Sequence, residues 1–240
     1  MSRRDAMGEG QSCSYREPSP YVLRFFRWYT RRHLRRHFAA VYMLGERPAL
    51  REGVPAVVFG SHPSWWEPLT GLYLQERLFP ARMMAGPIEA GQLKKFPILG
   101  KVGLFGIRPG SAEGARDLLR GVREHFRRPG AMLWMTPQGR FADVRERPLG
   151  LAGGVEFLAR AFPDAVFLPL ALEYLFWNDR LPVVLCHFGP PAAAGAMESA
   201  LTAAMDRLAA AAITRDPGNF HCLLRGAGGT GGVYDWRGGE

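Results

Sequence analysis

The chain has 240 residues, a length that favours one domain with short appended segments over two domains. Its 31 basic and 22 acidic residues give a net charge of +9, and residues 1–51 alone carry 11 arginines and four acidic residues, a surplus of +7 that predicts a surface facing anions. Three widely spaced cysteines argue against a disulfide framework or a zinc site and favour a reducing compartment. No apolar stretch reaches the roughly 18 to 20 residues of a membrane span, and no signal peptide is expected.

The N-terminal region divides into two segments of different character. Residues 1–20 are polar, show no periodicity and are expected to form a flexible arm. Residues 21–44 place apolar and aromatic side chains at helical spacing, with arginines along another stripe. We therefore expect residues 21–50 to be a basic amphipathic helix that docks on an anionic membrane surface. A helix packed on the core with a solvated charged face is the alternative.

From residue 51 to residue 225, short apolar runs alternate with helical patterns. The expected strands lie at residues 54–60, 81–86, 101–110, 131–135, 165–172 and 182–188. The expected helices begin near Ser64, after the cap Ser111, at residue 154 and near residue 195. This alternation predicts an α/β fold class with a mixed, largely parallel sheet flanked by helices. Residues 226–240 are too rich in glycine for regular structure and form a separate closing segment.

The stretch SHPSWWEP, residues 61–68, places His62 directly after a predicted strand and Glu67 five positions later. In open α/β sheets, chemistry is usually done in the loops that leave the carboxyl ends of strands. An imidazole can take a proton from a hydroxyl, and a carboxylate within reach fixes its tautomer and stabilises the imidazolium. Without a serine or cysteine nucleophile, such a dyad predicts direct activation of a substrate hydroxyl, with no covalent enzyme intermediate.

The same residues have a structural interpretation. Ser64 and Glu67 match a capping box, in which the serine caps a helix and the glutamate reaches back to the backbone. A histidine after a strand also serves often as a structural residue. The other histidines considered, His125, His187 and His221, lack metal-ligand spacing and are expected to be structural, so no metal site is predicted.

Four blocks of this chain resemble, in order, the conserved blocks of the glycerolipid acyltransferases, the lysophosphatidate acyltransferase-like family. His62-x4-Glu67 is similar to the family's catalytic His-x4-Asp, with glutamate in place of aspartate. The segments GLFGIRP (103–109), TPQGR (136–140) and VFLPLAL (166–172) are similar to the second, third and fourth blocks. The resemblance covers roughly residues 55–172, and the basic aromatic helix is similar to the family's membrane-docking segment.

The resemblance implies transfer of a fatty acyl group from an acyl-CoA or acyl-ACP thioester, as co-substrate, to an alcohol, without a metal or redox cofactor. It implies that His62 is the general base and that Glu67 orients it. It places the substrate-binding residues at Arg108, Gln138, Gly139 and Arg140. The two arginines would bind an anion, because guanidinium groups match phosphate oxygens bidentately; ordinary surface arginines are the alternative.

Departures from the family pattern bear on the acceptor. Gln138 stands where the family has glutamate, and the arginine arrives one residue early, which argues against a glycerol phosphate pocket. Trp65, Trp66, Trp134 and Phe141 lie in or beside the blocks and form either substrate-binding walls or core. We include Trp65 and Trp66 among the substrate-binding candidates. The expected acceptor is a bulky or glycosylated lipid alcohol, such as a carotenoid glycoside, with a lysophospholipid as the other candidate.

The expected partners are an anionic membrane surface, acyl-CoA or acyl carrier protein, and a lipid acceptor, with the protein peripheral on the cytoplasmic face of the cell membrane. A non-enzymatic protein that binds anionic membranes or nucleic acid through phosphates is a competing hypothesis. No nucleic-acid partner is expected, because no nucleic-acid-binding motif occurs outside the basic helix. A hydrolase that uses His62 and Glu67 on water is a third hypothesis, and the missing Gly-x-Ser-x-Gly elbow argues against it.

Overall fold

The computed structural model describes residues 15–227, and the predicted C-terminal segment lies outside them from residue 228 onward. The chain has the predicted α/β fold, with a mixed sheet and flanking helices. The described strands are β1 (Ala40–Leu44), β2 (Ala56–Gly60), β3 (Met83–Glu89), β4 (Leu104–Ile107), β5 (Ala131–Met135), β6 (Val166–Leu175), β7 (Val183–Phe188) and β8 (Phe220–Arg225). The described helices are α2 (Pro20–His37), α3 (Glu67–Leu78), α4 (Ala90–Lys95), η1 (Pro97–Val102), α5 (Ala112–Phe126), α6 (Gly154–Ala161), α7 (Met197–Ala212) and η2 (Pro217–Asn219).

The eight strands found in residues 15–227 form one sheet in the order β4-β3-β5-β2-β6-β7-β1-β8. Five neighbouring strands, from β4 to β6, run parallel, so their carboxyl ends share one edge of the sheet. β7 pairs antiparallel with β6, and β1 runs parallel to β7. β2 is buried at every position, as its run of apolar residues predicts for a central parallel strand.

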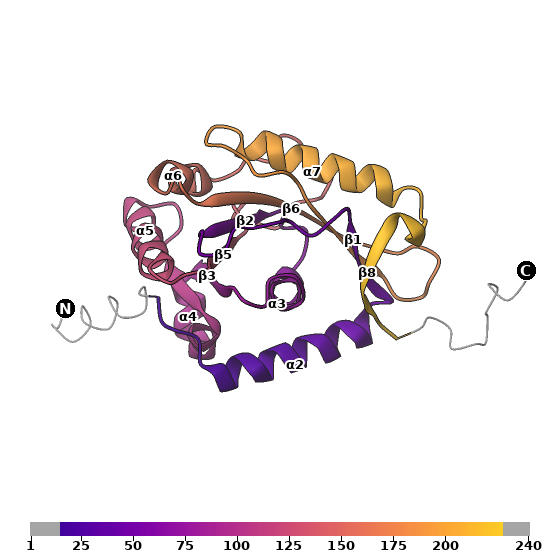
Figure 1. Cartoon of the computed structure of the whole chain (residues 1–240), viewed down its shortest axis with the longest axis horizontal. Helices are drawn as coiled ribbons and strands as arrows, with labels where there is room; N and C mark the ends of the chain where they lie inside the picture. The colour runs from indigo at the N-terminus through magenta and orange to yellow at the C-terminus, as the bar shows by residue number, and fades with distance from the viewer. Residues whose placement is uncertain (1–14, 228–240) are drawn as a thin grey trace, which may run out of the picture.

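Helices cover both faces of the sheet (Figure 1). α5, α6 and α7 lie on one face, where Val122, Leu158 and Leu208 enter one half of the apolar core. α3 covers the other face and buries Leu74, while α2 lies outside α3 and contributes Leu34. The basic N-terminal helix is therefore an outer layer of the same domain and packs against α3.

α2 is shorter than the predicted helix. It ends at His37, and the expectation of a helix over residues 21–50 is wrong beyond that point, because Ala40–Leu44 is strand β1. β1 pairs with β7 on one side and with β8 on the other. Backbone pairing on two sides outweighs the local helical periodicity, which carries no information about these distant partners.

The N-terminal arm is also shorter than predicted. The ring of Tyr15 packs 4.8 Å from the ring of His125, and the Ser19 N–H donates to the Lys101 carbonyl at 2.8 Å. Residues from Tyr15 onward are thus fixed on the domain, while residues 1–14 of the predicted arm lie outside the described range. Among residues 15–227, every helix is too short or too polar to cross a bilayer.

Candidate active site

His62 lies at the edge of the sheet where the parallel strands end. Ser61 extends the pairing of β2 with β6, because its N–H donates to the Leu170 carbonyl at 3.1 Å and its Oγ accepts the Leu172 N–H at 3.0 Å. The next residue leaves the sheet. Its N–H donates to Gln138 Oε1 at 3.0 Å and its carbonyl accepts the Ala142 N–H at 3.0 Å, so the main chain of His62 is held on both sides.

The ring of His62 contacts the Glu67 carboxylate. Nδ1 lies 2.8 Å from Oε2, and the Ser64 N–H donates to the other oxygen, Oε1, also at 2.8 Å. Only 6% of Glu67 is exposed. One carboxylate oxygen of Glu67 thus contacts the imidazole, and the other accepts from the Ser64 backbone as the glutamate of a capping box does. The cap is nevertheless displaced, since α3 begins at Glu67 and not near Ser64.

The environment of Glu67 sets the chemistry of the dyad. Burial raises the pKa of Glu67 above its ordinary value, although the hydrogen bond and charge of His62 oppose that rise. An ionised Glu67 accepts a hydrogen bond from the Nδ1–H group of His62, which leaves Nε2 as the unprotonated, basic atom of the ring. Tyr174 donates to Thr70 Oγ1 at 3.0 Å, and burial together with the Glu67 charge raises the pKa of Tyr174 well above its usual range. Tyr174 is therefore a neutral hydroxyl beside the dyad.

Two cavities meet at His62. The larger, which we call the cleft, has a volume of about 690 Å³ and is bordered by the ends of β3, β4 and β5 and by the start of α5. The smaller, which we call the apolar pocket, has a volume of about 240 Å³ and extends between α3 and the sheet. Pro87, Ile88, Met135 and Thr136 line both, so a ligand in either cavity reaches the same imidazole.

The apolar pocket is made by residues from six elements, β2, α3, β3, β4, β5 and β6. Gly71 of α3 faces Trp134 of β5, and Met84, Leu104 and Leu170 contribute the remaining apolar surface. The indole N–H of Trp134 donates to Gln75 Oε1 at 2.7 Å, which fixes the ring in the wall. Trp134 is therefore both core and pocket wall, the two alternatives that the sequence left open.

Arg108 lines the cleft and is held by a buried carboxylate. Its Nε donates to Asp117 Oδ2 at 2.8 Å and its Nη2 to Oδ1 at 3.2 Å. Burial alone would raise the pKa of Asp117, but the hydrogen bonds and charges of Arg108 and Arg120 outweigh it and keep that pKa below its ordinary value. The positive charge of Arg108 is thus largely neutralised before any ligand arrives.

The structure separates the other predicted substrate-binding residues. Gly139 lines the cleft. The Gln138 amide instead accepts from the His62 N–H through its oxygen and donates to the Leu149 carbonyl at 3.5 Å through its nitrogen. Arg140 pairs with Glu146, with Nη1 and Oε2 3.1 Å apart, and lines neither cavity. No signal in the TPQGR block predicted that its glutamine would support the histidine backbone.

The aromatic residues near the dyad also differ in position. The Phe141 ring lies 4.5 Å from the His62 ring and is largely exposed, so it covers the dyad on the outer side. Trp65 and Trp66 stack on each other at 4.3 Å and line neither cavity. Trp66 packs instead on α2, at 5.3 Å from the His33 ring and 4.8 Å from the Phe38 ring.

Comparison with solved structures identifies a similar fold. No protein-family model matches the chain. No curated protein sequence matches it either. Among solved structures, the chain is similar to the crystal structure of the 1-acyl-sn-glycerophosphate (LPA) acyltransferase from Thermotoga maritima, with a TM-score of 0.51 and 13% sequence identity. The similarity covers 81% of this chain and 79% of that chain, so the two share a fold over most of their length.

Proposed function

We propose that the protein transfers a fatty acyl group from an acyl-CoA or acyl-ACP thioester to the hydroxyl of a lipid alcohol. The observation that carries this proposal is the His62–Glu67 pair, 2.8 Å apart, placed where the cleft and the apolar pocket meet. The fold shared with an LPA acyltransferase supports it. His62 and Glu67 would be the catalytic residues, in the His-x4-Glu form of the family's motif.

In the proposed reaction, Nε2 of His62 takes the proton of the acceptor hydroxyl as its oxygen attacks the thioester carbonyl carbon. The new C–O bond forms, the C–S bond breaks, and the proton on His62 passes to the departing thiolate. Glu67 stays ionised, fixes the tautomer through Nδ1 and stabilises the imidazolium. Transfer would be direct, because the described residues that line the two cavities include no cysteine, and the hydroxyls of their two serines, Ser61 and Ser111, are hydrogen-bonded to backbone groups.

The two cavities suit the two parts of the substrates. The apolar pocket, lined by Gly71, Trp134 and Leu170, would take the acyl chain. The cleft would take the acceptor and the uncharged part of the donor next to the thioester. With both bound, the thioester carbonyl and the hydroxyl meet at His62, which lines both cavities.

The charges of the cleft favour an acceptor without a phosphate monoester. Among the described residues that line it, Arg108 is the sole lysine or arginine, and Asp117 already pairs with it. Glu89, a carboxylate, also lines the cleft. A dianionic phosphate would meet little uncompensated positive charge there, whereas sugar hydroxyls would find donors and acceptors. We therefore assign a bulky or glycosylated lipid alcohol as the acceptor, in preference to a lysophospholipid.

Membrane docking through α2 is part of this proposal. Tyr21, Phe25 and Trp28 are 80%, 55% and 56% exposed, and arginines follow them on the same helix. Aromatic rings sit well at the level of lipid headgroups, and arginines meet lipid phosphates. A peripheral position on the cytoplasmic face of the cell membrane would bring lipid acceptors to the cleft.

The test is an assay of thiol release and ester formation with a panel of acyl-CoA and acyl-ACP donors. Each donor is combined with a neutral glycosylated lipid alcohol, with lysophosphatidate and with no acceptor. We expect acceptor-dependent release that is at least tenfold faster with the neutral alcohol. Turnover with lysophosphatidate alone would refute the acceptor class, and release that ignores every acceptor would favour a hydrolase. No release with any donor would favour a non-enzymatic binding protein.

A further inference from the structure

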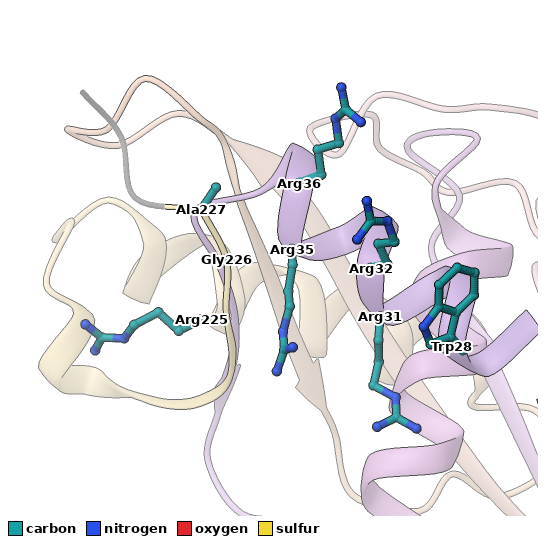
Figure 2. A pocket seen from close by; sticks show the side chains of 8 residues that line it. All are labelled: Trp28, Arg31, Arg32, Arg35, Arg36, Arg225, Gly226 and Ala227. Carbon is teal, nitrogen blue, oxygen red and sulfur yellow. The ribbon is translucent and has the colours of Figure 1, made fainter. Parts of the chain in front are cut away.

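Apart from the two cavities at His62, a further concavity lies where α2 meets the end of β8 (Figure 2); we call it the arginine groove. Its volume is about 650 Å³, and it shares no residue with the cleft or the apolar pocket. Its lining residues are Trp28, Arg31, Arg32, Arg35, Arg36, Arg225, Gly226 and Ala227. The chemistry proposed for His62 uses none of them.

The backbone holds the two sides of the groove together. After β8 the chain crosses the last turn of α2, where the Gly226 N–H donates to the Ala39 carbonyl at 2.9 Å and the Ala227 N–H to the Arg35 carbonyl at 2.6 Å. A Cβ at Gly226 would lie 1.8 Å from the Phe38 carbonyl oxygen, so this crossing requires glycine. The backbone of Arg225 is thereby held near the end of α2, while its side chain points away from the α2 arginines (Figure 2).

The four arginines of α2 that line the groove form two pairs. Arg31 and Arg35 are four residues apart, as are Arg32 and Arg36, so each pair consists of neighbours on the helix surface. Figure 2 shows Arg31 and Arg35 pointing to one side of the helix and Arg32 and Arg36 to the other. Arg31 also contacts Glu76 of α3 at 2.9 Å.

Most of this charge is uncompensated within the protein. Among residues 15–227, Arg32, Arg35, Arg36 and Arg225 have no carboxylate within 4.0 Å. Like charges four residues apart repel each other in the absence of an anion. Two adjacent guanidinium groups can grip the oxygens of one phosphate, so two pairs match a ligand with two phosphates.

The position of the groove favours a lipid headgroup over a soluble anion or a nucleic acid. The exposed rings of Tyr21 and Phe25 lie on α2 outside the groove, and Trp28 lines the groove itself, so aromatic rings and arginines share one helix as at a membrane interface. Stacking on successive nucleic-acid bases needs several rings along the cationic track, whereas Trp28 is the one aromatic ring among the described residues that line the groove.

The groove also lies at the edge of the sheet that carries His62. Gly60, the last residue of β2, pairs with Leu170 of β6. β6 continues past that point to Leu175, its last residue, which pairs with Val183, the first residue of β7. Ala40 of β1 lies opposite both Val183 and Arg225. A membrane held at the groove would therefore face the edge at which the cleft begins.

We propose that the arginine groove binds the headgroup of an anionic phospholipid that carries two phosphate groups, with one phosphate at each arginine pair. This inference rests on the proposed membrane docking and names the lipid that the docking surface recognises. Trp28, which lines the groove and is largely exposed, enters the headgroup layer beside the bound lipid.

The test measures binding of the full chain to phosphatidylcholine vesicles that contain either diphosphatidylglycerol or phosphatidylglycerol, at equal surface charge and without acyl donor. We expect the wild-type protein to bind the diphosphatidylglycerol vesicles at least tenfold more tightly. The double variant Arg32→Gln, Arg36→Gln should bind them about thirtyfold more weakly, the effect of two arginine charges near an anionic surface. The control Arg116→Gln, Arg123→Gln removes two exposed arginines of α5 and should stay within about threefold of wild type.

Equal binding of the wild-type protein to the two vesicle types would overturn the proposal, and so would equal losses in the groove and control variants. Single-stranded DNA that displaces the protein from vesicles through Arg32 and Arg36 would also overturn it, in favour of a nucleic-acid site. These measurements use no thioester, so their failure leaves acyl transfer untouched. Conversely, a protein without acyl-transfer activity would leave the lipid preference to be decided by the vesicle measurements alone.

Discussion

The apolar pocket beneath His62 allows a quantitative prediction, because Gly71, its glycine on α3, leaves room that a side chain would fill. A Cβ at Gly71 would lie 3.3 Å from Trp134 Cε3 and 3.7 Å from Met84 Cε. A larger side chain there has to extend into the pocket of about 240 Å³. We expect Gly71→Leu to remove room for about four acyl methylenes, one for each added carbon. At about 0.8 kcal/mol per buried methylene, long-chain donors should lose about 3 kcal/mol, or about 150-fold in kcat/KM.

The assay is competition among acyl donors of increasing chain length, with wild-type and Gly71→Leu proteins. Short donors that end before Gly71 serve as the internal control and should stay within about threefold of wild type. Chemical denaturation shows whether overpacking against Trp134, which costs typically about 1–3 kcal/mol, has unfolded the variant. Equal losses for short and long donors in a folded variant would refute the assignment of this pocket to the acyl chain, as would no loss at all.

Two further predictions concern carboxylates that hold cationic partners. Glu67→Asp shortens the side chain by one methylene, so the carboxylate cannot keep both of its 2.8 Å contacts, to His62 and to the Ser64 N–H. We expect kcat/KM to fall about 10- to 100-fold, the equivalent of one charge-assisted hydrogen bond. Full activity would show that one of these two contacts is dispensable. Asp117→Asn should lower the free energy of unfolding by about 2 kcal/mol near pH 7, less than for a fully buried pair because Arg108 and Arg120 are about half exposed. Because the folded-state pKa of Asp117 is lowered, this stabilisation is complete above the ordinary carboxyl pKa of about 4 and disappears as the pH falls through the lower folded value. Urea unfolding of the wild-type and Asp117→Asn proteins near pH 7 and in acid measures this stabilisation. A difference in unfolding free energy that grows in acid would contradict the assignment.

The parts of the site that the sequence predicted are local in the chain. His62 and Glu67 are five residues apart, so the strand end and the start of α3 suffice to bring them together. The cap of α5 is equally local, and Ser111 Oγ accepts the Gly114 N–H at 2.9 Å as predicted. Apolar runs also located the central strands, because buried parallel strands read as continuous apolar segments.

What the sequence did not predict depends on distant partners. The apolar pocket joins residues from β2, α3, β3, β4, β5 and β6, and no local pattern relates Gly71 to Trp134. β1 was predicted as helix and β8 was missed, because each is a strand through its pairing with the other. The TPQGR block indicated its importance but not its geometry: Gln138 supports the His62 main chain, and Arg140 pairs with Glu146 outside both cavities. The cleft therefore lacks this cation, which is a reason to propose a neutral lipid alcohol as the acceptor in preference to a lysophospholipid.

The central claim is that His62 removes the proton from an acceptor hydroxyl, and it is tested most directly by the rate of acceptor-dependent thiol release in His62→Ala. The matched control is His221→Ala, which removes an exposed histidine on β8. With both variants folded, we predict a loss of at least about a thousandfold for His62→Ala, within the range for a general base, and a wild-type rate for the control. A folded His62→Ala protein that transfers acyl groups at the wild-type rate would contradict the account.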